Sequence, residues 1–137
     1  MSKKSIIQLS EFDITQKVIE ALSNVCTRSV LFSVKKESKD VTQIANELKI
    51  SISTVYKTLS TLEELALAEV EKYVISTEGK KIKLYRSRIG KVEITLENLE
   101  PTLKLYPNDN FSESGWFFYS YSRGLELMFR IKSMFII

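Results

Sequence analysis

The sequence contains no histidine and only one cysteine, Cys26, among its 137 residues. Histidine is the usual general base near neutral pH and the commonest metal ligand. Its absence excludes Ser-His-Asp and Cys-His nucleophile systems, and a single cysteine cannot supply a four-thiolate zinc site or an intrachain disulfide. A carboxylate-based enzyme remains possible, but no spacing of acidic residues indicates one. We therefore expect a protein that binds rather than catalyses, without a metal ion or a cofactor.

Glycine is scarce as well, with four residues, and no Gly-rich loop of the kind that holds phosphate is present. The N-terminus lacks the long apolar run of a secretory signal, and the uncharged stretch 114–122 is too short to cross a bilayer. Apolar content is 44% and charged content 27%, which is typical of a globular domain. We expect a cytoplasmic protein with no membrane partner.

Apolar residues recur at helical spacing in four segments of the first half of the chain. Ser51 is a natural N-cap for the last of them, and either Ser10 or Asp13 is expected to cap the first. Lys35 and Lys36 are expected in the last turn of the second, where cations suit the helix dipole. The segments are 13–23, 27–36, 41–49 and 52–65.

The period then changes from helical to alternating. Residues 69–76 and 81–88 alternate on either side of a Gly-bearing turn at 77–80, which predicts a β-hairpin. A third alternating run covers 92–96. Pro101 and Pro107 are expected to break the chain beyond it, with residues 107–110 as a terminating loop.

Two helices, a short turn and a basic hairpin follow the order of a winged helix-turn-helix. The tight helix pair needs a small residue at the crossing, where Ala45 stands, and an apolar residue after the turn, where Ile50 stands. Val55 supplies the apolar residue of the second helix that faces the first, and Ile52, Leu59 and Leu62 fall on the same side of the helical wheel. The predicted fold is a winged helix-turn-helix, mostly α with a β-hairpin wing (α+β).

The string IANELKISISTVYKTLSTLEELALAEV, with the later EGKKIKLYRS, resembles the winged helix-turn-helix transcription regulators of the ArsR and TrmB type. The resemblance covers roughly residues 13–96. It implies a sequence-specific regulator that binds double-stranded DNA as a homodimer, commonly through the first helix and a C-terminal element. Many members carry glycine where Lys49 stands, because that turn favours a left-handed conformation, which lysine adopts at some energetic cost.

The face of the fourth helix that points away from the core is small and hydroxylated and carries one lysine, Lys57, which suits insertion into a major groove. The lysines at the hairpin tip are expected to reach adjacent phosphates or the minor groove. The alternative is that these residues only solubilise a helix and protect an edge strand. The candidate DNA-binding residues are Thr42, Gln43, Ser51, Ser53, Thr54, Tyr56, Lys57, Ser60, Thr61, Lys80, Lys81 and Lys83.

Six cations and no acid lie between Gly79 and Lys91, whereas the rest of the chain has 14 cations and 17 acids. The positive charge of the protein is therefore concentrated in the wing. Arg86 and Arg88 lie deeper than the tip lysines and are expected to pair with acids of the core unit instead. Because winged helices also serve in protein assembly, a protein–protein module that does not bind DNA is the alternative function.

Two features leave alternatives open. The apolar stripe of Ile14, Val18 and Leu22 supplies either part of a dimer surface or intramolecular core. Cys26 is interpreted first as a buried small hydrophobe and second as a redox-sensing thiol that forms an intersubunit disulfide.

Three regions are predicted: an N-terminal arm over 1–12, a DNA-binding domain with a trailing β segment over 13–110, and a C-terminal extension over 111–137. The last 22 residues, 116–137, hold seven of the 14 aromatic residues. Three interpretations of the extension compete. They are a helix packed in the dimer interface, an amphipathic segment on an anionic membrane, and an extension from a non-native reading frame that packs poorly.

Overall fold

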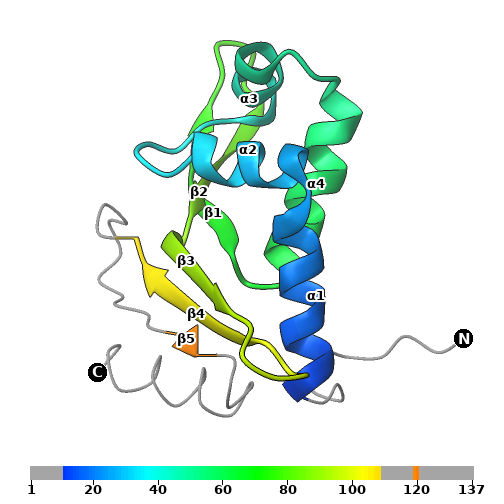
Figure 1. The fold of residues 1–137 in the computed structure, drawn as a ribbon. Coiled ribbons are helices and arrows are strands. Elements are labelled where there is room, and N and C mark those ends of the chain that lie inside the picture. The colour runs from blue at the N-terminus through cyan, green and yellow to red at the C-terminus, as the bar shows by residue number, and fades with distance from the viewer. Residues whose placement is uncertain (1–10, 109–118, 121–137) are drawn as a thin grey trace, which may run out of the picture.

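Four helices form the first half of the protein in the computed structural model, which describes residues 11–108 and 119–120. The helices are α1 (Glu11–Ser23), α2 (Val25–Ser33), α3 (Val41–Leu48) and α4 (Ile52–Glu64). Helix α2 packs against α1, α3 and α4, and α3 packs against α4. The long α1 runs downward from this group in Figure 1, toward the second sheet of the protein.

Two antiparallel sheets follow the helices (Figure 1). The wing is the hairpin of β1 (Ala68–Ile75) and β2 (Lys81–Ser87). We call the second sheet the trailing sheet; its strands are β3 (Ile89–Thr95), β4 (Thr102–Pro107) and β5 (Tyr119–Ser120), in the order β3-β4-β5. The prediction of a winged helix-turn-helix with a hairpin wing is therefore confirmed.

One core joins the helices to both sheets. Helix α1 contributes Ile14, Val18 and Leu22, which are 1%, 0% and 5% exposed, so this stripe is intramolecular core. The trailing sheet contributes Leu103 and Leu105 of β4, both fully buried, and α1 packs against this strand. The other buried apolar side chains of the core are Val30, Leu31, Val34, Val41, Ile44, Ala45, Val55, Leu59, Leu62, Leu65, Leu67, Ala68, Tyr85 and Ile89.

Strand β4 contradicts the expected chain break. Pro101 precedes the strand and Pro107 is its last residue, so the two prolines bound β4 instead of interrupting it. Within the strand, Leu103 and Leu105 are the buried residues, and exposed Lys104 lies between them. The expected terminating loop over 107–110 is therefore wrong at Pro107, which is paired with Ile89.

Helix boundaries differ from the prediction at three places. Asp13 lies inside α1 and is not its cap, while Ser10 lies outside the described residues. Helix α2 begins earlier than expected, because Asn24 caps it by accepting a hydrogen bond from the Thr27 backbone N–H. It also ends at Ser33, so Lys35 and Lys36 follow the helix and do not occupy its last turn.

Ile52 is the exception on the inner side of α4. Val55, Leu59 and Leu62 are buried as predicted, but Ile52 is 48% exposed. It is the first residue of the helix, and side chains on a helix tilt toward its N-terminus. Its side chain therefore extends past the end of the helix instead of over the core.

Candidate nucleic-acid interface

The turn between α3 and α4 is held by the residues that the sequence singled out. Ala45 of α3 and Val55 of α4 are both buried, and Ile50 packs against the core. The Ile50 backbone N–H donates to the Ala45 carbonyl at 3.1 Å. Lys49 has φ 58° and ψ 46°, the left-handed conformation that favours glycine. This confirms that lysine adopts the strained turn.

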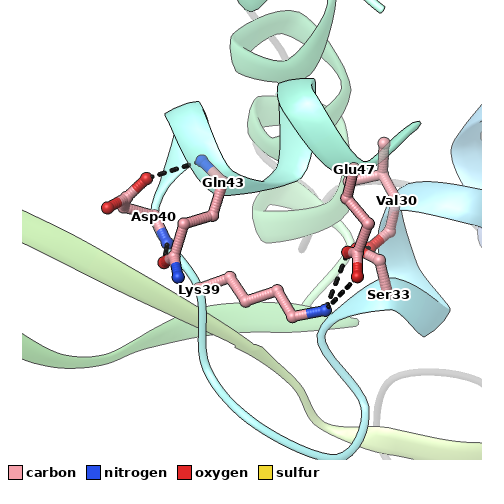
Figure 2. Close-up of polar contacts among 6 residues, drawn as sticks. All are labelled: Val30, Ser33, Lys39, Asp40, Gln43 and Glu47. Atoms are coloured by element: carbon pink, nitrogen blue, oxygen red, sulfur yellow. Dashed lines mark hydrogen bonds and ion pairs between the residues drawn. The ribbon is translucent and has the colours of Figure 1, made fainter. Parts of the chain in front are cut away.

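Helix α3 is fixed at both ends (Figure 2). At its start Asp40 and Gln43 form a capping box, in which the Asp40 carboxylate accepts from the Gln43 N–H at 2.8 Å and the Gln43 side chain accepts from the Asp40 N–H at 2.9 Å. Near its end, Lys39 Nζ donates to the two carboxylate oxygens of Glu47 at 2.7 and 2.9 Å. The helix that positions α4 is thus secured by local polar contacts.

Helix α4 begins with a cap and presents a hydroxyl-rich face. The Ser51 Oγ accepts from the Thr54 N–H at 3.1 Å and donates to the Thr54 Oγ1 at 2.8 Å. Thr54 is half-buried, and the Thr61 hydroxyl donates to the Lys57 carbonyl at 3.3 Å. The candidate residues with exposed side chains on α4 are Ser53, Tyr56, Lys57, Ser60 and Thr61.

The N-terminal end of α3 adjoins this face. Thr42 and Gln43 are both exposed there. The capping box uses the carbonyl oxygen of the Gln43 side chain and not its NH₂ group. Ser51 and Gln43 therefore cap α4 and α3, respectively, in addition to any contact that they make with a ligand.

The tip of the wing is a tight turn organised by Ser76. Its Oγ accepts hydrogen bonds from the backbone N–H groups of Glu78 and Lys80 at 3.2 and 3.0 Å. Gly79 has φ +85°, which a residue with a side chain rarely adopts. Because the turn is locked in this way, the lysines beside it start from a defined position.

A groove separates the wing from the helix pair. It has a volume of about 450 Å³ and runs between the start of α3, Tyr56 on α4 and the lysine side of β2. Lys80, Lys81 and Lys83 all lie along it and are exposed. Lys81 Nζ lies 4.4 Å from the centre of the Tyr73 ring, a cation–π contact that extends this side chain over the hairpin face.

Arg86 and Arg88 do not belong to this basic surface. Arg86 lies 3.0 Å from Glu71, and Arg88 lies 3.6 Å from Glu69. Both arginines are buried, and both acids come from the neighbouring strand β1 of the wing. The expectation that these arginines pair with acids is correct, but the acids belong to the wing itself.

Sequence reasoning missed two residues of the wing, Lys72 and Tyr73. Both are exposed on β1, where Lys72 lies opposite Leu84 and Tyr73 opposite Lys83. They were missed because only the charges from Gly79 onward were considered, although the cross-strand register that places them beside β2 follows from the hairpin turn.

The base of the wing is attached to the helical unit by Tyr85, which exchanges backbone hydrogen bonds of 3.1 and 2.8 Å with Lys39. Burial, with a smaller effect of Glu63, raises the pKa of the Tyr85 hydroxyl.

Other ligand chemistry finds little support in the described part of the chain. No cluster of three or more metal-ligating side chains is found among residues 11–108 and 119–120, and no helix there is long and apolar enough to span a bilayer. Cys26 is half-buried instead of buried, because it lies in the first turn of α2 beside Val25, which is 67% exposed. Of the C-terminal extension over 111–137, the structure describes only β5, which pairs with β4. The three interpretations of the extension depend on residues 111–118 and 121–137, which lie outside the described residues.

Two comparisons with known proteins agree with this geometry. Residues 28–70 match the family described as bacterial regulatory protein, arsR family. The chain is also similar to a protein of Methanocaldococcus jannaschii that is named as an uncharacterized HTH-type transcriptional regulator. The two share 31% identity over 93 residues, which cover 68% of this chain and 93% of the relative.

Proposed function

Since the chain belongs to the ArsR-like winged helix-turn-helix transcription regulators, we propose that it binds double-stranded DNA with sequence specificity. Helix α4 lies in the major groove, and the wing contacts the flanking phosphates. The observation that carries this proposal is the joint exposure of the α4 face and of Lys80, Lys81 and Lys83 on the two sides of one groove.

The two surfaces have different chemical tasks. The hydroxyls and Lys57 on α4 suit base edges, where hydrogen bonds distinguish one base pair from another. The wing lysines suit phosphates, which fix position and supply affinity without reading sequence. Thr42 and the NH₂ group of Gln43 lie at the start of α3, where they are suited to contact phosphates of the DNA strand next to this helix. In this function the protein regulates by occupying its site and performs no catalysis.

The assembly and location follow from the same function. A unit with one α4 reads a short half-site, and a homodimer gains affinity and specificity by reading two. The proposed protein is therefore a cytoplasmic homodimer. Its DNA-binding domain spans residues 13–110, between an N-terminal arm (1–12) and a C-terminal extension (111–137).

Salt dependence of binding tests the proposal. The full chain is titrated against randomised duplex DNA by fluorescence anisotropy across a salt series, and its preferred site is then selected from the same pool. Each phosphate contact adds about 0.9 to the slope of log affinity against log salt, so the Lys80→Ala/Lys81→Ala/Lys83→Ala variant is expected to flatten the slope by about 2.7. A matched variant, Lys17→Ala/Lys36→Ala/Lys104→Ala, removes three exposed lysines outside the wing and α4 and should keep the slope.

A protein–protein assembly module is the second candidate. It is favoured by the exposed apolar side chains of the wing, where Tyr73, Val74 and Ile75 are 50%, 39% and 67% exposed. Absence of duplex binding at low salt would reject the DNA-binding proposal and favour this alternative. A slope that is equal in the wing variant and the matched control would reject the role of the wing.

A further inference from the structure

Strand β3 has an open edge in the part of the chain that the structure describes. The trailing sheet has the order β3-β4-β5, so β4 has neighbours on both sides whereas β3 has one. An edge strand offers its outward backbone N–H and C=O groups to another strand. Recognition by strand addition uses such edges. The β3 edge is therefore suited to receive a strand from a second molecule.

An apolar surface adjoins this edge. Val92 and Ile94 lie opposite Leu105 and Leu103, so all four side chains belong to the core-facing side of the sheet. The two leucines are fully buried, but Ile94 is 44% exposed, and Leu96 just beyond the strand is 74% exposed. A hollow of about 360 Å³ runs along β3 here, walled by Ile19, Leu22 and Phe32. The core-facing side of the sheet is thus covered over β4 and left open over β3.

The opposite side of β3 carries charges that are self-complementary. Lys91 and Glu93 are two residues apart, and their Nζ and Oε2 atoms lie 3.2 Å from each other. Their side chains are 62% and 44% exposed. The strand has seven residues, Ile89–Thr95, and Val92 is its midpoint. In an antiparallel pair of two β3 strands centred on Val92, Lys91 of each copy lies opposite Glu93 of the other, and opposite charges across a ladder are stabilising.

We propose that two copies of the chain associate through antiparallel pairing of their β3 edges about a two-fold axis at Val92. This rests on the homodimer of the proposed function and names its interface. The stripe of α1 is already buried within one chain, so it is not available for the contact. In the paired register residues 90–94 of the two strands overlap. Ile89 lies outside the overlap, because it is fully buried and its backbone N–H and C=O groups already bond to the Ser87 Oγ, and the strand is irregular between Ile89 and Lys91.

Charge reversal tests this interface in the full chain. Sedimentation equilibrium measures the dimer dissociation constant of the wild type, of Lys91→Glu, of Glu93→Lys and of the double variant. Each single variant places like charges opposite each other at two symmetric positions and is expected to weaken the dimer about tenfold. The double variant restores opposite charges and should return to the wild-type value. Lys36→Glu is the matched control, since it reverses an exposed lysine in the loop after α2, outside the trailing sheet.

Each failure has a distinct meaning. A wild type that stays monomeric would overturn both the interface and the homodimer. If Lys91→Glu weakens the wild-type dimer no more than Lys36→Glu does, the β3 interface alone is overturned and the homodimer stays in place. Failure of the double variant to recover would overturn the Val92 register. If the wild type is a dimer but does not bind duplex DNA, the DNA-binding function is rejected and the proposed interface still stands.

A cross-link tests the register independently. Cys26 is the only cysteine, so Cys26→Ser provides a background without thiols. In that background Val92→Cys places two thiols across the axis, and mild oxidation with copper phenanthroline should give a dimer that a reductant reverses. Thr95→Cys is the control on the same strand, because residue 95 lies beyond the overlap and far from its own copy. Equal cross-linking of the two variants would overturn the register.

Discussion

Arg86 and Glu71 form a buried ion pair at the root of the wing. The guanidinium Nη1 of Arg86 donates to both carboxylate oxygens of Glu71, at 3.1 and 3.0 Å, and each side chain is 7% exposed. Arg86 Nε also donates to the Lys35 carbonyl at 3.2 Å, on the loop that follows α2. The pair therefore holds the hairpin against the helical unit instead of adding to its basic surface.

Breaking this pair should destabilise the fold. Glu71→Gln leaves the buried Arg86 without its counter-charge, and the expected loss is about 3 kcal/mol in the free energy of unfolding. Glu71→Met/Arg86→Met should lose less, because it buries no unpaired charge. Urea denaturation followed by circular dichroism measures both. The Lys39–Glu47 pair is the control, because Glu47 is 50% exposed, and Glu47→Gln should cost less than about 1 kcal/mol. Equal losses for Glu71→Gln and Glu47→Gln would contradict the prediction.

Lys49→Gly should stabilise the protein, although it removes a side chain. Lys49 holds φ 58°, and the left-handed conformation costs a residue with a Cβ about 1–2 kcal/mol. Glycine relieves that strain but loses more conformational entropy on folding, so the expected net gain is about 1 kcal/mol. Lys49→Ala is the control, since it removes the same charge and keeps the strain. Thermal denaturation measures the stability of both variants. Equal stabilisation by Lys49→Ala and Lys49→Gly would show that loss of the charge, and not relief of backbone strain, causes the effect.

The two parts of the interface should respond differently to mutation. Lys57→Ala is expected to lower discrimination between the selected site and random duplex by about 1–3 kcal/mol, because base-edge contacts carry specificity. Lys80→Ala should weaken binding to both duplexes equally and lower the salt slope by about 1. Competition anisotropy with the two duplexes measures both quantities. The opposite pattern, with specificity lost in Lys80→Ala, would reverse the roles assigned to α4 and the wing.

The trailing sheet should show a pH response centred on Glu93. The hydrogen bond from the Tyr106 hydroxyl, at 2.9 Å, and the nearby Lys91 hold the pKa of Glu93 below its ordinary value of 4.5. A lowered pKa in the folded state gives stability that is present above the ordinary value and is lost as the pH falls through the lowered one.

Tyr106→Phe should therefore raise the pKa of Glu93 toward 4.5, as measured from its carboxyl carbon by NMR titration. Lys104→Gln is the control, because Lys104 is the weakest of the causes that lower this pKa, and it should shift the titration less. A Glu93 titration that Tyr106→Phe leaves unchanged would show that the hydroxyl does not hold the carboxylate.

The helix pair was predictable because its signals are local. The spacing of Ala45, Ile50 and Val55 is set by one turn and the two helices beside it. Ser51 was recognisable as a cap from its place before an apolar helix. The same holds for the hairpin, since Gly79 and the alternation around it lie within twenty residues. A structural feature that depends only on neighbouring residues can be predicted from the sequence of that segment.

The missed features depend on distant parts of the chain. Strand β4 has the alternation of a strand, but its flanking prolines resembled breaks, and only its pairing with β3 and its packing on α1 show that Leu103 and Leu105 are core. The partners of Arg86 and Arg88 were misplaced for a similar reason. Their acids were expected in the core unit, whereas the pairing of β1 with β2 brings Glu71 and Glu69 of the wing to them.

One carbonyl group joins three parts of the molecule. The Lys35 carbonyl accepts from Arg86 Nε of the wing and from Asn108 Nδ2 beyond the end of β4, and the same Asn108 group donates to the Ser87 carbonyl at the end of β2. These three hydrogen bonds connect the end of β4 to the base of the wing through the loop after α2. We therefore expect a displacement of β4 to change the angle between the wing and the helices.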